Sequence, residues 1–296
     1  MWLSSYGAAV KDFPLPGSGR SSVAASAPGP GAHHWAGASS AALDDDGSLV
    51  VAYRVRVTAD DYAATVVGRS KDGADLETVV TLDKGRFDAM SMERPALVRT
   101  ENGQWRLYVC SATPNSKHWW IDALEADDPA GFADAEPRTV FPGDENVGVK
   151  DPVIRRADGV WHAWICCHPL DEADEEDRMT TAYATSADGL DWDWHGTALS
   201  PRPGRWDSRG ARVTAVLPDG RAAYDGRATK DENWFERTGL AGPAGEPGRL
   251  VQTNDAPISH MRYLDVLPLP GGGYRIWYEA PLPGESKELR TELIEV

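Results

Sequence analysis

Glycines in tight turns recur along this chain at nearly constant spacing. Five of them follow Asp, Asn or Gly between two apolar runs, at positions 47, 103, 159, 220 and 272, which are 56, 56, 61 and 52 residues apart. Asp-Gly and Asn-Gly supply the positive φ that the tight turn of a β-hairpin needs. Each repeat therefore predicts a hairpin, such as the one around Asn102 and Gly103 in ERPALVRTENGQWRLYVCSA.

A second series of turn glycines lies between the first, at positions 73, 131, 189 and 248, which are 58, 58 and 59 residues apart. Two hairpins per period make four strands per period. The repeats therefore predict an all-β, five-bladed β-propeller with four antiparallel strands per blade. The alternative is a β-sandwich with frequent turns, but a sandwich has no reason to repeat every 52–61 residues.

The 296 residues are expected to form a single domain, because the repeats continue to the end of the chain. Residues 1–30 are predicted to be an irregular N-terminal segment rich in Pro, Gly, Ser and Ala. The last repeat is one strand short. We expect part of the N-terminal segment to supply that outer strand and close the ring, since an open propeller exposes unpaired strand edges.

The charge of the chain excludes several classes of partner. Thirty Lys and Arg against 46 Asp and Glu give a net charge of −16, which argues against nucleic acid or an anionic membrane as the main partner. The longest apolar runs, such as residues 49–53, are too short to span a bilayer, and the N-terminus lacks a secretory signal. A cytoplasmic location is therefore predicted.

Motifs for cofactor or metal chemistry are missing from the sequence. There are three Cys and no Cys-x-x-Cys, so neither a disulfide framework nor a zinc site is expected. No Gly-rich phosphate loop, Gly-x-Ser-x-Gly or His-Glu-x-x-His occurs. The sequence therefore predicts no cofactor and no metal.

Ionisable residues gather where a propeller places its function. The first strand of each blade lines the central axis, and residues at its start surround the axial funnel. These positions hold His33, His34, Trp35, Glu93, Arg94, Lys150, Asp151, Asp207, Arg209, Arg212, His260 and Arg262. Buried charge is costly unless it is paired or reached by water or ligand. The pattern thus indicates either a binding site or a ring of structural ion pairs, for example Glu93 with Arg212.

Three motifs resemble the five-bladed propeller glycosidases of glycoside hydrolase families 43, 32, 68, 62 and 130. They are the Asp-Pro in VKDPVI, the Glu-Arg-Pro in MERPALV and the hairpin YATSADGLDW, and the resemblance covers roughly residues 30–296. It implies a sugar in the axial funnel, surrounded by a base or nucleophile, an orienting Asp and a Glu acid. Lys150-Asp151-Pro152 is similar to the Arg-Asp-Pro motif of these families, whose Asp tunes the pKa of the acid.

The chain departs from that pattern at the first blade. The families place a base Asp there, whereas GAHHWAGAS offers only His33 and His34. One explanation is that the set of catalytic residues is shifted by one blade, with Glu93 as base, Asp151 as tuning residue and Asp207 as acid. The other is different chemistry on the same fold, with His33 or His34 as acid or base, because His titrates near neutral pH.

Two geometric expectations follow. The carboxyls of Glu93 and Asp151 should approach each other within the range of about 5 to 9.5 Å that glycosidases use, with an imidazole of His33 or His34 on the opposite wall. Five basic residues should gather at the funnel and suit a uronate, a phosphate or a polyol. They are Arg94, Lys150, Arg209, Arg212 and Arg262.

Two classes of function remain open from the sequence. The first is an enzyme that cleaves or transfers a glycosidic linkage of a small saccharide or glycoconjugate. The second is a non-hydrolytic protein on the same scaffold, either a sugar-binding pseudoenzyme or a biosynthetic enzyme. Residues 171–177, DEADEED, are interpreted as a solvated loop, with a cation site or a lid as alternatives.

Overall fold

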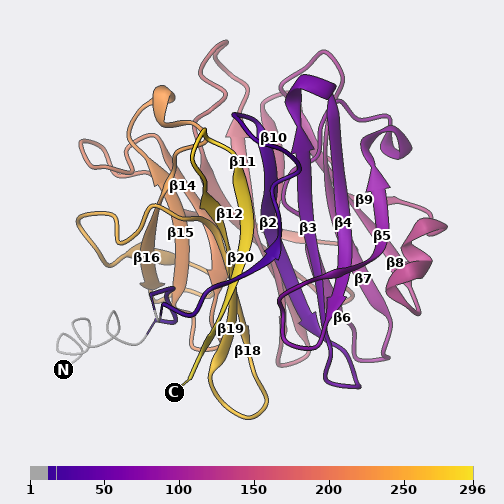
Figure 1. The fold of residues 1–296 in the computed structure, drawn as a ribbon. Coiled ribbons are helices and arrows are strands. Elements are labelled where there is room, and N and C mark those ends of the chain that lie inside the picture. The colour runs from indigo at the N-terminus through magenta and orange to yellow at the C-terminus, as the bar shows by residue number, and fades with distance from the viewer. Residues whose placement is uncertain (1–12, 18, 296) are drawn as a thin grey trace.

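The computed structural model describes residues 13–17 and 19–295 (Figure 1). These residues form twenty β-strands and four 3-10 helices, of which the longest has five residues. None of the helices in the described ranges has the length and apolar character needed to cross a membrane. The expectation of an all-β chain is confirmed.

Nineteen of the strands follow one another along the chain in five groups. Group I comprises β2 (His34–Leu43), β3 (Leu49–Val57), β4 (Tyr62–Ser70) and β5 (Glu77–Asp83), and group II comprises β6 (Ala96–Arg99), β7 (Trp105–Ala112), β8 (Trp119–Ala126) and β9 (Arg138–Phe141). Group III comprises β10 (Val147–Ala157), β11 (Val160–Pro169), β12 (Thr180–Ser186) and β13 (Asp193–Leu199), and group IV comprises β14 (Gly210–Val216), β15 (Ala222–Arg227), β16 (Arg237–Pro243) and β17 (Leu250–Gln252). Group V comprises β18 (Arg262–Pro268), β19 (Tyr274–Pro281) and β20 (Lys287–Ile294).

Short 3-10 helices occupy four of the connections. They are η1 (Thr58–Asp60), η2 (Lys84–Phe87), η3 (Pro129–Ala133) and η4 (Lys230–Glu232). The hairpins form at the predicted turns. Residues Ala157 and Val160, for example, pair directly across Asp158 and Gly159, whose φ values of 51° and 81° are those of a two-residue primed turn.

The strands pair into four-stranded sheets, as predicted. Groups II, III and IV are separate sheets, while groups I and V join into one eight-stranded sheet through a single parallel bridge between Trp35 and Lys287. Strand β1 (Ser22–Ala25) pairs antiparallel with β20, so the N-terminal segment provides the fourth strand of group V. The expectation also concerned residues 1–12, which lie outside the described residues.

The hydrophobic core consists of five clusters, each shared by neighbouring groups. Representative pairs are Val50 with Leu107 between I and II, Tyr108 with Trp161 between II and III, Trp164 with Tyr224 between III and IV, Leu240 with Ile276 between IV and V, and Val51 with Trp277 between I and V. Figure 1 shows groups I and V side by side, with β20 next to β2. Each group therefore depends on its neighbours for its core, as in a propeller.

Candidate functional site

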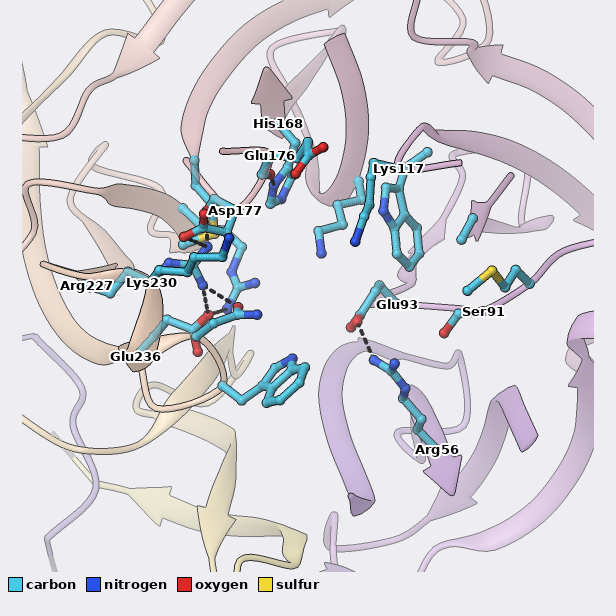
Figure 2. A pocket seen from close by; sticks show the side chains of 18 of the residues that line it. Arg56, Ser91, Glu93, Lys117, His168, Glu176, Asp177, Arg227, Lys230 and Glu236 are labelled. Carbon is cyan, nitrogen blue, oxygen red and sulfur yellow. Dashed lines mark hydrogen bonds and ion pairs between the residues drawn. The ribbon is translucent and has the colours of Figure 1, made fainter. Parts of the chain in front are cut away.

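A cavity of about 870 Å³ opens at one end of the strand groups, and every group contributes to its lining. Arg56 comes from group I, Glu93 from the segment before group II, Lys150 from group III, Arg212 from group IV and Arg262 from group V. The volume is in the range of ordinary small-molecule sites. Figure 2 shows its polar side chains converging on the open centre.

Glu93 lies at the floor of this cavity. Arg54 in β3 donates a hydrogen bond to Glu93 Oε2, and Arg56 Nη1 lies 3.3 Å from Glu93 Oε1. Burial alone would raise the pKa of Glu93, but the positive charges of Arg54, Lys150 and Arg56 outweigh it and hold the pKa below its usual value. Glu93 is therefore a carboxylate at neutral pH.

Asp151 lies beneath Glu93 and is fully buried. Its Oδ1 accepts a 3.0 Å hydrogen bond from the Arg94 backbone N–H, and its Oδ2 accepts one of 3.0 Å from Arg212. The Tyr263 hydroxyl lies 3.4 Å from Glu93 Oε2 and 3.3 Å from Asp151 Oδ2. The two carboxyls thus lie close together, as expected, with one hydroxyl between them.

A second carboxylate faces Glu93 from the other side of the cavity (Figure 2). Glu236, in the connection before β16, is buried, with Arg227 Nη1 at 2.8 Å and Arg262 Nε at 2.6 Å. Burial would raise its pKa, but Arg262, Arg212 and Arg227 outweigh burial and hold the pKa below its usual value. Glu236 is therefore ionised as well.

Buried ion pairs connect the two carboxylates beneath the cavity. Glu279 in β19 accepts hydrogen bonds of 2.6 Å from Arg54 and 2.8 Å from Arg262. A chain of alternating charge thus runs from Glu93 through Arg54, Glu279 and Arg262 to Glu236. The ring of ion pairs considered from the sequence exists, but Glu93 pairs with Arg54, and Arg212 pairs with Asp151.

A further wall of the cavity carries His168, Lys117 and Lys150, with Lys150 Nζ 4.7 Å from the Trp119 ring centroid. Burial and the nearby Lys150 lower the pKa of His168 well below its usual value, so the imidazole is neutral. Its Nδ1 lies 2.7 Å from the Glu176 carbonyl oxygen, which can only accept. Nδ1 therefore carries the proton, and Nε2 is an acceptor.

The acidic segment 171–177 forms part of the wall. Arg209 donates to the Asp177 carboxylate at 2.7 and 2.6 Å, and Lys230 Nζ donates to the Asp174 carbonyl at 2.6 Å. Asp174, Glu176 and Asp177 line the cavity. The interpretation as a solvated loop is therefore wrong for its second half, because cations of group IV hold that half against the site.

Several expected site residues lie away from the cavity. Asp207 is fully buried between Arg202, at 2.9 Å, and the Tyr224 hydroxyl, at 2.8 Å, and it does not line the cavity. The placement of Asp207 beside Glu93 is thus wrong: its segment turns it toward the core between groups III and IV. His260 is exposed and also outside the lining.

The five basic residues do not gather as expected. Lys150, Arg212 and Arg262 line the cavity, whereas Arg209 turns aside to Asp177. The Arg94 guanidinium points away, to the Ser39 carbonyl and to Asp265, and lines a second cavity of about 270 Å³. Carboxylate and carbonyl acceptors therefore draw two of the five away.

The histidines of the first repeat do not face the site. His34 Nδ1 lies 3.2 Å from the Ala32 carbonyl, and the His33 ring packs on Trp35 and Trp234. Trp35 is almost completely buried beneath Arg54 and Arg56. Neither imidazole lines the cavity, so the expected histidine wall is absent among its lining residues, and Trp234 lines it instead.

Several residues that shape the cavity and its floor were not predicted from the sequence. They are Arg54, Arg56, Lys117, His168, Arg227, Lys230, Glu236, Tyr263 and Glu279. A usable signal was present in two of them. Arg54 interrupts the apolar strand LVVAYRVRV and Glu279 the apolar strand YRIWYEAP, and a charge inside such a strand is costly unless it is paired.

The fold of this chain is similar to that of several solved structures. No family model matches the chain, and no curated protein matches it in sequence. Among solved structures, β-1,2-mannobiose phosphorylase from Listeria innocua is similar with a TM-score of 0.63 and 13% identity, over 96% of this chain and 93% of that one. An α-L-arabinofuranosidase from Lactobacillus brevis has a TM-score of 0.66 and 14% identity, over 87% and 90%. Sucrose-6-phosphate hydrolase from Lactobacillus gasseri has a TM-score of 0.64 and 10% identity, over 90% and 61%.

These similarities confirm the resemblance to propeller glycoside hydrolases at the level of the fold. The described residues hold no group of three or more His, Cys, Asp or Glu side chains arranged to bind a metal ion. What the cavity offers on its own is five acidic side chains, among them the ionised Glu93 and Glu236, together with a neutral imidazole and several cations.

Proposed function

We propose that this protein is a single-domain, five-bladed propeller enzyme that cleaves or transfers a glycosidic linkage of a small saccharide or glycoconjugate bound in the 870 Å³ cavity. The five shared core clusters support five blades, with group V closed by β1 and packed on group I. The observation that carries the function is the ionised Glu93 at the cavity floor, joined to Asp151 through Tyr263.

Glu93 has the properties of the carboxylate that stabilises an oxocarbenium-like centre. Its low pKa suits a base or nucleophile and not an acid. Asp151 is fully buried and would orient the floor without touching the sugar. Glu176 is a better candidate than Glu93 for the acid that protonates the leaving group. It lines the cavity, and no Lys or Arg among the described residues forms an ion pair with it.

Phosphorolysis is a second candidate, and a specific feature favours it. Lys117 and Lys150 line the cavity and have no carboxylate within ion-pair distance in the described part of the chain. Two cations with no carboxylate in ion-pair distance among the described residues suit an inorganic phosphate that replaces water as the attacking group. One of the similar structures is a mannoside phosphorylase.

The test is turnover of a panel of nitrophenyl furanosides and pyranosides, with and without inorganic phosphate. Glu93→Gln should fold normally and lose at least about a hundredfold in kcat/KM, the scale for removing a catalytic base. Glu77→Gln, on the exposed edge strand β5, is the control. Full activity in Glu93→Gln would refute the role of Glu93, and saccharide binding without turnover would establish the non-hydrolytic alternative.

A further inference from the structure

The cavity has an apolar rim above its charged floor. Met90, Trp234 and Phe235 are 53, 37 and 51% exposed, which is unusual for large hydrophobic side chains. Met90 and Trp234 line the cavity, and Phe235 follows Trp234 directly. Exposed hydrophobic side chains at the edge of a polar cavity are typical of a binding surface.

Trp234 is held in place by contacts that leave part of its indole open. Its φ of 74° lies in the left-handed region, which is strained for a bulky residue. The His33 ring packs edge-on against the indole at 5.1 Å, and the Trp35 ring lies at 5.7 Å. Lys287 Nζ donates to the Trp234 carbonyl oxygen. Strain that the surroundings maintain at a half-exposed residue points to a functional role.

The contacts also place Trp234 relative to Glu93. The Arg56 guanidinium carbon lies 5.4 Å from the Trp35 ring, and its Nη1 lies 3.3 Å from Glu93 Oε1. Trp35 and Arg56 thus form a chain of contacts between Trp234 and the carboxylate. Glu93 and Trp234 both line the cavity, so a two-ring substrate with its reacting bond at Glu93 would bring its second ring to Trp234.

We propose that Trp234 is a stacking platform for the second ring of the substrate, with His33 and Trp35 setting its orientation. This inference rests on the proposed function and specifies its substrate class: a glycoside whose neighbouring ring has a flat apolar face. That face is either the C–H face of a second sugar or an aromatic aglycone, and both pack on an indole.

The first experiment measures the platform without any sugar. Binding of 4-methylumbelliferone is followed by calorimetry to wild type, Trp234→Ala and Trp234→Phe. We expect Trp234→Ala to weaken binding about tenfold, the scale of one aromatic contact, and Trp234→Phe to retain most of it. Trp194→Ala is the control, because Trp194 in β13 is 47% exposed and outside the cavity lining.

The second experiment distinguishes a second sugar from an aromatic aglycone as the ring that packs on Trp234. β-1,2-Mannobiose is compared with 4-nitrophenyl and methyl mannosides and arabinofuranosides, by calorimetry and, where turnover occurs, by KM. Loss of affinity in Trp234→Ala for the disaccharide only identifies a second sugar, and loss for the aryl compounds only identifies an aromatic aglycone. Either result supports the platform.

Two results would overturn the inference. One is equal affinity of wild type and Trp234→Ala for every two-ring probe and for 4-methylumbelliferone; the other is no binding of any of these compounds to wild type. If methyl glycosides are turned over and the Trp234 variants bind every probe as wild type does, the platform is refuted and the proposed function stands. Binding that depends on Trp234, without turnover of any glycoside, would support the platform and refute the proposed enzymatic function.

Discussion

Tyr263 is the residue on which the cavity floor converges. Its φ is 50°, its backbone N–H donates to Asp225 at 3.1 Å, and its hydroxyl accepts from Arg212 at 2.8 Å. With a single proton, that hydroxyl can donate to only one of Glu93 and Asp151 at a time. Its position therefore fixes how the two carboxyls face each other.

Tyr263→Phe should lower kcat by tenfold to about a hundredfold with little change in KM, because a hydrogen bond to a charged group is lost at the reacting centre. The measurement is steady-state kinetics on whichever panel glycoside is turned over. Tyr108→Phe is the matched control, since the Tyr108 hydroxyl bonds a backbone carbonyl, that of Gly189, outside the cavity lining. An unchanged kcat in Tyr263→Phe would assign Tyr263 to packing alone.

Asp265 links the stability of the fold to pH. Burial raises the pKa of Asp265 to about 6, although Arg94 lies 3.3 Å away and opposes the shift. The unfolded pKa is about 3.9, so the folded protein holds the extra proton between these values. The contribution of this group to stability is complete below about pH 4 and is lost as the pH rises through about 6.

The melting temperature of Asp265→Asn should therefore rise relative to that of wild type as the pH increases from 4.5 to 7.5. The expected change corresponds to roughly 2–3 kcal/mol. Differential scanning calorimetry at the two pH values measures it, with Asp158→Asn, in an exposed turn, as the control. A constant difference across this range would contradict the raised pKa.

At the scale of elements, β1 protects the outer edge of group V. Its residues pair with β20, and Ala24 is buried in the core shared with group I. Deleting residues 1–25 should expose the β20 edge, lower the melting temperature by several degrees and promote aggregation. Thermal unfolding with light scattering tests this, and an unchanged curve would show that β1 is dispensable.

Hairpins were predictable from the sequence, whereas the centre of the site was not. A turn such as Asp158-Gly159 depends on two adjacent residues, so local chemistry decides it. The contact between Tyr263 and Glu93 joins residues 170 positions apart, and the Asp207 segment turns inward for reasons of packing. Carboxylates at the start of the first strand of a group were therefore found, but which of them share a cavity depends on how all five groups pack together.

At the scale of the molecule, no group has a core of its own, because each cluster is shared by two neighbours. Unfolding should therefore occur as one cooperative transition, with the calorimetric enthalpy equal to the van't Hoff enthalpy. Replacing Trp35, which joins groups I and V through its bridge to Lys287, should lower the midpoint temperature of that single transition. Two separate transitions would instead indicate that some of the strand groups fold without the others.

The segment 171–177 is held to the cavity partly through its backbone. His168, Arg227 and Lys230 all donate to main-chain carbonyls there, namely those of Glu176, Asp177 and Asp174. Mutation cannot remove a carbonyl. Evolution, or a randomised library at position 174, can therefore exchange a side chain that lines the cavity while the wall stays docked, so that new substrate preferences can arise here at little cost to the scaffold.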